Sequence, residues 1–171
     1  MILISRPQLE DAEQIHGVIK ISWYATYIND EIGITKEDID CNYQDDPEPQ
    51  IQALRNRAIN PKDSDVSLVA KEGEKVLGYI RLKILSDSID LITLYIHPEH
   101  SGKGIGTKLW LEALKVLPKD KKPITVEVAS YTKAVDFYKK IGFVDTGERY
   151  TKEAMLSSGT PMPLMKMIFV N

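Results

Sequence analysis

The spacing of apolar positions in the first third of the chain predicts a strand followed by helices. Residues 1–6 form an apolar run of strand length, and from Gln8 onward apolar residues recur with the spacing of one helix face. The residues of that face are Ile15, Val18, Ile19 and Trp23. Thr35 and Asp38 then have capping-box spacing, and a further helix is predicted from about Pro49 to Ala58.

From residue 66 the apolar pattern has the composition and spacing of strands. Three segments rich in β-branched residues are separated by turn-forming residues at 72–74 and 86–88, which predicts an antiparallel meander. The segments are Val66–Ala70, Val76–Leu85 and Ile89–Ile96.

Helices and strands alternate in the last third. A helix is predicted over Gly102–Leu117, and its apolar face consists of Ile105, Leu109, Ala113 and Val116. The remaining predicted elements are a strand at Ile124–Val128, a helix at Lys133–Ile141 closed by Gly142, and strands at Phe143–Glu153 and Pro163–Val170. The pattern as a whole predicts one α+β domain over residues 1–171, with a mixed, mostly antiparallel sheet of six to seven strands and about four helices.

Composition narrows the possible classes of protein. The chain has 171 residues with 43% hydrophobic and 27% charged positions, an ordinary globular balance. A net charge of -3 gives no global basic field for nucleic acid or an anionic membrane, and the single cysteine, Cys41, excludes a disulfide framework and a cysteine-based zinc site. No apolar run is long enough to span a membrane, and the first residues lack a basic leader. We therefore expect a cytoplasmic protein without a metal.

The segment 94–109, LYIHPEHSGKGIGTKL, is the most informative stretch of the sequence. A strand stops at a proline, and a turn containing Gly102, Gly104 and Gly106 opens an amphipathic helix. The first amides of such a helix can hold phosphate groups, and Lys103 and Lys108 add positive charge nearby. The spacing matches neither a nucleotide P-loop nor the dinucleotide fingerprint, and a turn that only caps the helix is the simpler alternative.

The same segment resembles the coenzyme A motif of the GNAT acetyltransferase superfamily, R/Q-x-x-G-x-G/A, with Gly104 and Gly106 in the glycine positions. Residues 134–143, AVDFYKKIGF, resemble the second signature of that superfamily, A-x-x-F-Y-x-x-x-G-F. Residues 77–80 resemble its third strand, and residues 6–11 resemble its first strand and helix, so the resemblance covers essentially the whole chain. Ser101 replaces the usual Arg or Gln, and Tyr131 stands where relatives often have an Asn.

This resemblance implies acetyl-CoA as co-substrate and a sheet that splays between its fourth and fifth strands. The backbone of Leu94 and Ile96 is then expected to contact the pantetheine arm, and Tyr131 or Thr132 to replace the missing Asn. The residues implied in coenzyme binding are Leu94, Ile96, Ser101, Gly102, Lys103, Gly104, Ile105, Gly106, Thr107, Lys108, Tyr131, Lys133 and Tyr138.

The resemblance also implies the catalytic residues. Tyr138 is the expected general acid, because a phenol keeps its proton at neutral pH and can protonate the departing thiolate. The alternative is that Phe137 and Tyr138 only pack the helix against the sheet. Glu127 is the expected general base, with Asp90 as a second candidate, and both could equally be solvated strand residues. His97 is expected at the rim of the coenzyme site.

The acceptor is implied less directly. Residues 22–31 are expected to follow the first helix. They resemble the Trp-x-x-Thr-Tyr region of the spermidine/spermine acetyltransferase-like branch. This resemblance implies Trp23, Tyr27 and Asp30 as substrate-binding residues. Acidic residues between 30 and 40 would suit a polyamine, although such a run can also be a solvated face. The alternatives are an acetyltransferase of protein N-termini and a non-catalytic acetyl-CoA-binding regulator. The oligomeric state is open, with a homodimer among the possibilities.

Overall fold

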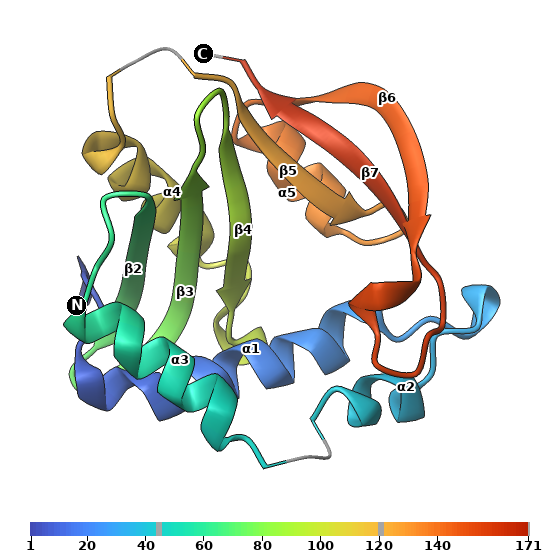
Figure 1. Cartoon of the computed structure of the whole chain (residues 1–171), viewed down its shortest axis with the longest axis horizontal. Helices are drawn as coiled ribbons and strands as arrows, with labels where there is room; N and C mark the ends of the chain where they lie inside the picture. Colours follow the sequence, from blue (N-terminus) through green and yellow to red (C-terminus); the bar gives the residue numbers. More distant parts are fainter. Residues whose placement is uncertain (44–45, 120–121, 171) are drawn as a thin grey trace. The chain divides into compact units, whose positions relative to one another are not determined.

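A computed structural model describes residues 1–43, 46–119 and 122–170, which are organised as two compact units (Figure 1). The first unit consists of Met1–Ser22 and Pro47–Lys122, and the second of Trp23–Asp46 and Pro123–Asn171. Helix α1 (Ala12–Tyr27) contributes residues to both units.

The sheet of the first unit is the predicted antiparallel meander preceded by one more strand. Strands β1 (Ile2–Ser5), β2 (Asp65–Glu72), β3 (Lys75–Ile84) and β4 (Ile89–Ile96) each pair antiparallel with the next. Arg81 pairs with Thr93 whereas Leu82 pairs with Leu91, so Ile92 is the extra residue of a β-bulge in β4. A bulge cannot be read from the alternation of residues, and the sequence did not predict it.

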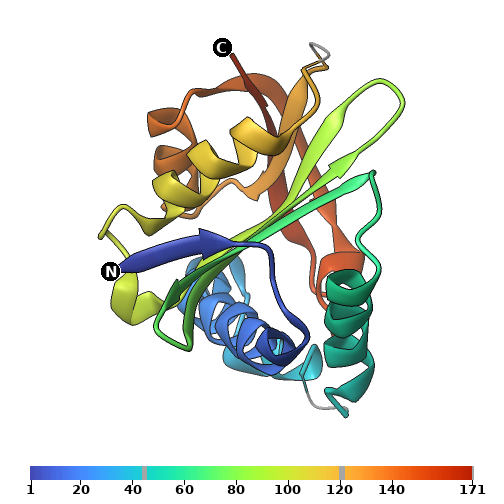
Figure 2. The ribbon, with the colours of Figure 1, turned by 90° about the vertical axis from the view of Figure 1, so that its left-hand side faces the viewer.

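Helices cover both faces of this sheet. Figure 2 shows α4 (Ile105–Val116) on one face, and α1 with α3 (Glu48–Ile59) on the other. Two 3-10 turns, η1 (Leu9–Asp11) and η3 (Pro98–His100), precede α1 and α4. Trp110 is 1% exposed while Val116 is 51% exposed, so the predicted apolar face of α4 was wrong at its last position and omitted its largest residue.

The second unit has a three-stranded antiparallel arrangement with one helix against it. Strand β7 (Met162–Phe169) pairs with both β5 (Ile124–Ala129) and β6 (Phe143–Lys152), and α5 (Ala134–Lys140) contacts β5 and β6. The smaller elements are η2 (Asp30–Ile32), α2 (Lys36–Cys41) and η4 (Glu153–Met155). One buried hydrophobic cluster of this unit consists of Ile34, Ile39, Ala129, Leu156, Met162 and Leu164.

Two local predictions in the second unit have direct structural explanations. Thr35 and Asp38 form the predicted capping box: the Asp38 amide donates to Thr35 Oγ1 (3.3 Å), and the Thr35 amide donates to Asp38 Oδ2 (2.7 Å). Gly142 follows α5 with φ of 104°, and a Cβ there would lie 2.8 Å from the Phe169 ring. Both the backbone angle and the close approach therefore require glycine.

The predicted class is confirmed, because the described residues contain seven strands and five α-helices in an α+β arrangement, against about four predicted helices. The prediction that residues 22–31 follow the first helix was wrong for residues 22–27. Helix α1 continues through Tyr27, so Trp23 and Tyr27 are helical. In the described part of the chain, every helix is too short or too polar to cross a bilayer.

Candidate active site

The turn after β4 has a backbone shape that depends on glycine. Gly102 and Gly104 have φ of 77° and 78°, in the left-handed region that other residues rarely adopt. A Cβ at either position would meet open space, so the requirement for glycine comes from the backbone angle and not from crowding. The turn therefore leads into α4 with its backbone exposed.

The first amides of α4 have no partners within the described residues. The first intrahelical bond runs from the Lys108 amide to the Gly104 carbonyl (3.0 Å), and no side chain caps the helix. The amides of Ile105, Gly106 and Thr107 thus have no acceptor among these residues. Unpaired amides at the positive end of a helix dipole form a site for an anion such as pyrophosphate.

The side chains around this turn are mostly basic. Ser101, Lys103 and Lys108 are exposed, and no acidic residue occupies the first turn of α4. Desolvation, together with the charge of Lys103, lowers the pKa of His100 below its usual value. The local charge therefore favours an anion next to the free amides.

One group of side chains near this turn has potential metal ligands. His97, Glu99 and His100 place one ligand atom each within 4.8 Å of one another, the only such group found in the described ranges. The Nδ1 atom of His97 already accepts a long hydrogen bond from the Glu99 amide (3.4 Å). Only its Nε2 is fully available as a ligand, and the trio is a weak candidate for a metal.

The end of β4 presents the predicted backbone groups of Leu94 and Ile96. The His97 amide donates to the Leu77 carbonyl of β3 (2.8 Å), so the amides of Leu94 and Ile96 point to the opposite edge of the strand. The Ile96 carbonyl accepts a hydrogen bond from Ser22 Oγ (3.1 Å), an interaction that the sequence did not predict. This bond fixes the strand end against α1.

In the second unit, Tyr138 lies on α5 with its ring in the core. The residue is 7% exposed and packs edge-on against Phe137 and Phe143, with ring centroids 5.4 and 5.5 Å away. Burial raises the pKa of the phenol above its usual value, so the group keeps its proton at neutral pH. No described residue is hydrogen-bonded to its hydroxyl. Tyr138 is more buried than Phe137.

Glu127 lies on β5 within a polar group on the surface of the second unit. Its carboxylate forms an ion pair with Lys152 and a hydrogen bond with Tyr150. Burial by itself raises the pKa of Glu127, but these two partners outweigh burial, and the pKa lies below its usual value. The group is therefore ionised at neutral pH and is a weaker base than a free glutamate. Asp90, the second candidate base, is half-buried on β4 in the first unit.

The segment that was predicted to replace the usual Asn contact is held by internal hydrogen bonds. The Tyr131 hydroxyl donates to the Tyr27 carbonyl at the end of α1 (2.8 Å), and Thr132 Oγ1 donates to the Ala129 carbonyl (2.9 Å). Lys133 is exposed at the N-terminal end of α5. The hydroxyl of Tyr131 thus has a structural partner, and only its ring remains for a ligand.

An aromatic cluster surrounds Trp23 in the second unit. The ring of Trp23 meets those of Tyr27 and Tyr43 edge-on, with centroids 5.0 and 6.1 Å apart. Its indole nitrogen is buried and has no hydrogen-bond partner among the described residues. Six aromatic residues pack against the same buried cluster, and we call them the aromatic cluster. They are Trp23, Tyr24, Tyr27, Tyr43, Tyr131 and Tyr150.

The sequence missed four residues of this region: Tyr24, Tyr43, Tyr150 and Lys152. Tyr150 and Lys152 lie two apart on β6, a spacing that places both on one face of a strand and could have been noticed. Asp30, which was predicted as a substrate-binding residue, is exposed at the start of η2.

The structure groups the predicted site residues by unit. In the first unit, Leu94 and Ile96 end the strand that leads into the turn and helix formed by residues 101–108. In the second unit, the remaining predicted residues share α1, η2, β5 and α5 or the segments beside them. These are Trp23, Tyr27, Asp30, Glu127, Tyr131, Lys133 and Tyr138.

A glycine-rich turn with free amides, and a buried phenol on a short helix, are features of an acyl-transfer enzyme that binds a phosphorylated donor. Residues 34–165 match the acetyltransferase (GNAT) domain family. The chain belongs to this family. It is an N-acetyltransferase with acetyl-CoA as the donor.

Individual relatives support this assignment. The chain is 29% identical over 119 residues to the spermidine N(1)-acetyltransferase of Thermoplasma acidophilum, covering 69% of this chain and 71% of the relative. It is 38% identical over 77 residues to the peptidyl-lysine N-acetyltransferase YjaB of Salmonella typhimurium, covering 44% and 48%.

A solved structure is similar over nearly the whole chain. The PaiA N-acetyltransferase of Thermoplasma acidophilum, determined in complex with coenzyme A, has a TM-score of 0.75 and 26% identity. The alignment covers 97% of this chain and 98% of that protein. The predicted family and fold class are thereby confirmed.

Proposed function

We propose that this acetyltransferase acts on the primary amine of a small polycation, with spermidine-like polyamines as the substrate class. The observation that carries the proposal is the aromatic cluster of the second unit. The similarity to a spermidine N(1)-acetyltransferase points in the same direction. We further propose that residues 1–171 act as one catalytic domain, since the family match at residues 34–165 includes parts of both units.

Aromatic faces attract ammonium groups through the ring quadrupole. Two lysines of the chain already occupy such positions: Lys36 Nζ lies 5.7 Å from the Tyr24 ring centroid, and Lys152 Nζ lies 5.8 Å from that of Tyr150. These two contacts support the proposal, because they place ammonium groups at cation–π distance from rings of the cluster. A polyamine offers several such groups on an apolar chain, which matches a surface that is both aromatic and partly apolar.

Acidic residues of the second unit divide into structural and available groups. Asp38 is buried within its capping box and bonded to Thr160 Oγ1 (2.5 Å), and Asp40 accepts from Tyr24 (2.6 Å) and Lys36 (2.6 Å). Hydrogen bonds hold the pKa of Asp38 well below its usual range, so it is ionised but committed to the fold. Asp30, Glu31 and Glu37 are exposed, and we propose that they supply the attraction for a polycation.

We propose that the donor is held by the turn and helix at residues 101–108. The unpaired amides of Ile105, Gly106 and Thr107 would hold the pyrophosphate, with Lys103 and Lys108 adding charge. The amides of Leu94 and Ile96 would hold the pantetheine arm, because they point away from β3. Bound acetyl-CoA supplies the activated acetyl group.

For the chemical step we propose Tyr138 Oη as the general acid. Because its pKa is raised, the phenol is protonated at neutral pH and can protonate the coenzyme A thiolate as it departs. No described residue accepts a hydrogen bond from its hydroxyl and competes for that proton. Glu127 is the proposed general base, acting on the ammonium directly or through water. Its lowered pKa makes it ionised and ready to accept a proton, at the cost of basicity.

A second candidate is acetylation of lysine side chains in proteins. It is favoured by the similarity to a peptidyl-lysine acetyltransferase, which is higher in identity but covers less than half of either chain. A lysine side chain presents the same ammonium group as a polyamine, so the aromatic cluster is compatible with both.

Steady-state thiol release with acetyl-CoA distinguishes the candidates. The acceptors compared are spermidine, a lysine-containing peptide with a blocked N-terminus, and a lysine-free peptide with a free N-terminus. We expect kcat/KM for spermidine to exceed that for either peptide by about tenfold or more, a difference of about 1.4 kcal/mol in transition-state binding. Preference for the lysine peptide would establish the second candidate and refute the first.

A further inference from the structure

The first unit contains a cavity that the acetyl-transfer chemistry does not use. Its volume is about 630 Å³, within the range of small-molecule sites. Its walls come from the end of β1, the last turns of α3 with the loop that follows, the start of β2, β3 and the end of α4. The polar and charged residues that line it are Arg6, Asn56, Arg57, Asn60, Lys62, Asp65, Ser67 and Arg81.

The cavity has an excess of positive charge that the protein itself does not neutralise. Arg81 is paired with Asp65, whose Oδ1 accepts from both Nε and Nη2 at 2.8 Å. The other three cations are Arg6, Arg57 and Lys62, and no hydrogen bond or ion pair to their side chains is found among the described residues. Three like charges around one cavity repel one another, and an anion placed between them would relieve that repulsion.

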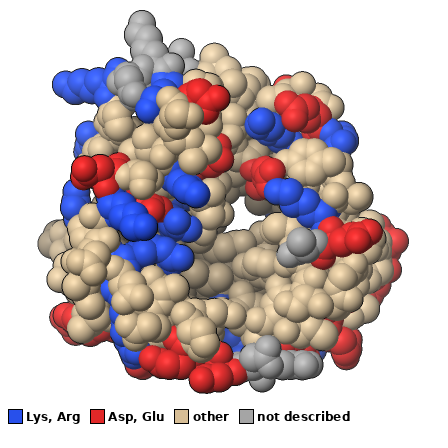
Figure 3. Space-filling model, in the orientation of Figure 1, with Lys and Arg blue, Asp and Glu red and all other residues tan. Residues whose placement is uncertain are grey.

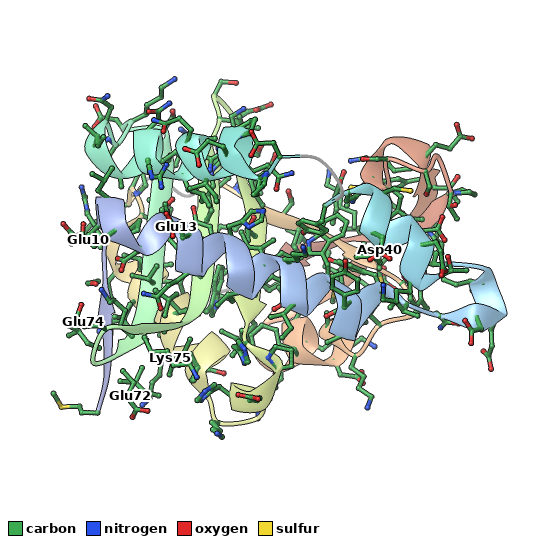
Figure 4. All side chains as sticks on the ribbon, turned by 90° about the horizontal axis from the view of Figure 1, so that it is seen from below. Glu10, Glu13, Asp40, Glu72, Glu74 and Lys75 are labelled. Carbon is green, nitrogen blue, oxygen red and sulfur yellow. The ribbon has the colours of Figure 1, made fainter. Side chains whose placement is uncertain are left out.

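This local charge is opposite to that of the protein as a whole, which carries a net charge of -3. Figure 3 shows basic side chains gathered over β2 and β3 on the face that it presents. Asp65 is the acidic residue of the cavity wall, and a group of other acidic residues of the same unit lies elsewhere: Figure 4 shows Glu10, Glu13, Glu72 and Glu74 around the start of α1 and the β2–β3 turn. Glu72 lies at the far end of β2 from Asp65, roughly 23 Å along the strand.

The cavity is separate from the donor turn within the same unit. Val116, the last residue of α4, lines the cavity, whereas the unpaired amides belong to the first residues of that helix. A helix of this length places its two ends roughly 17 Å apart. A ligand in the cavity would therefore leave the amides of Ile105, Gly106 and Thr107 accessible.

We propose that this cavity binds a small organic anion, with phosphate or carboxylate groups attached to an apolar body. Arg6, Arg57 and Lys62 would bind the anionic oxygens, and Asn56 and Asn60 offer further hydrogen-bond donors. About half of the lining residues are apolar, which suits a ligand with a carbon skeleton better than an inorganic ion. The apolar lining residues are Pro7, Ala53, Ala58, Pro61, Val66, Leu68 and Val116.

A purely structural role of the cations makes a different prediction. Arg57 lies in the last turn of α3 and Lys62 follows it, so both could stabilise the negative end of that helix dipole. Removal of their charge would then lower stability without affecting the binding of any anion. Binding and stability must therefore be measured on the same variants.

The test is calorimetric titration of the whole protein, with coenzyme A at saturation so that the donor turn is filled. ADP represents a phosphate ligand with an aromatic body, and citrate a carboxylate ligand. We expect one of them to bind with a Kd below about 1 mM. The double variant R57Q/K62Q should weaken that binding by about tenfold or more, since it removes two charged hydrogen-bond donors to the anion. K75Q, which removes an exposed charge at the β2–β3 turn, should leave it within about twofold.

The double variant should also unfold at a Tm close to that of the parent protein. If it fails to fold, the exposed R6Q substitution replaces it, with a smaller expected loss of affinity. Two results would overturn the proposal: neither anion binds while coenzyme A fills the donor turn, or the variants retain full affinity.

Discussion

In the first unit, the residues proposed to bind the donor lie close together in the sequence and act mainly through the backbone. In the second unit, by contrast, the proposed acceptor and catalytic residues come from several elements and act through side chains. Residues 101–108 need little more than two glycines with positive φ and three unpaired amides. The aromatic cluster draws on α1, the segment after α2, the segment after β5, and β6. A backbone site keeps its shape while the side chains around it vary. The acceptor differs between relatives, and side chains can change one at a time.

The largest expected effect comes from Tyr138→Phe in the second unit. The substitution keeps the ring and its contacts with Phe137 and Phe143 but removes the acidic proton. We expect kcat to fall by about 10- to 1,000-fold while coenzyme A affinity stays unchanged. Pre-steady-state turnover beside a binding isotherm measures both. Unchanged turnover would reduce Tyr138 to a packing residue, and a loss of affinity alone would make it a binding residue.

The pH dependence gives a second readout for the same residue. A raised pKa means that Tyr138 keeps its proton to higher pH than a free tyrosine does. The parent enzyme should therefore show no loss of kcat from this group between neutral pH and about pH 10. An alkaline limb near pH 8 that disappears in Tyr138→Phe would contradict the proposed protonation state.

Gly104→Val tests the backbone side of the comparison. Valine at φ of 78° is strained and adds a side chain beside the free amides. We expect coenzyme A binding to weaken by about tenfold or more, together with a loss of about 1–2 kcal/mol in the free energy of unfolding. Gly147→Val is the matched control, because Gly147 has φ of 85° in the second unit and also faces open space. Gly147→Val should lose similar stability but no coenzyme A affinity. Equal coenzyme A affinities in Gly104→Val and Gly147→Val would refute the proposed phosphate site.

A smaller effect is expected from the exposed acids of the second unit. If Asp30 attracts a polyamine, KM for spermidine should rise with ionic strength, because such attraction is screened. Asp30→Asn should raise KM by about twofold at low salt and flatten this dependence. Glu10→Gln removes an equally exposed charge from the first unit and should change neither. A KM that does not respond to salt would restrict polyamine recognition to the aromatic cluster.

Features set by neighbouring residues could be predicted from the sequence. The meander, the capping box of Thr35 and Asp38, the glycine turn and the cap at Gly142 are each determined over a few positions. Residues 22–31 were predicted to follow helix α1 because the last turn of the helix is aromatic and polar. The helix continues through Tyr27, since no strong stop signal occurs until Asn29 and Gly33. The apolar face of α4 was misjudged at Val116, since periodicity does not show where the sheet ends.

The acceptor side depended on contacts that no local pattern contains. Tyr24 bonds to Asp40 at 2.6 Å and Tyr131 to the carbonyl of Tyr27 at 2.8 Å, pairs separated by 16 and 104 residues. The resemblance to a known branch identified Trp23 and Tyr27, but Tyr43 and Tyr150 became apparent only in the folded chain. The same limit applies to Asp38 and Asp40, which the sequence grouped with the exposed acids and the structure commits to internal bonds.

The measurement that tests the central claim most directly is the pair of KM values, for acetyl-CoA and for spermidine, in Gly104→Val and Trp23→Phe. Trp23→Phe keeps an aromatic face but removes the buried indole nitrogen, which has no hydrogen-bond partner in the part of the chain that the structure describes. We expect a crossed pattern: Gly104→Val raises KM for acetyl-CoA by about tenfold and leaves that for spermidine within about twofold, while Trp23→Phe does the reverse with a smaller change of about threefold. If both variants raise both KM values to the same extent, the division of donor and acceptor recognition between backbone and side chains is wrong.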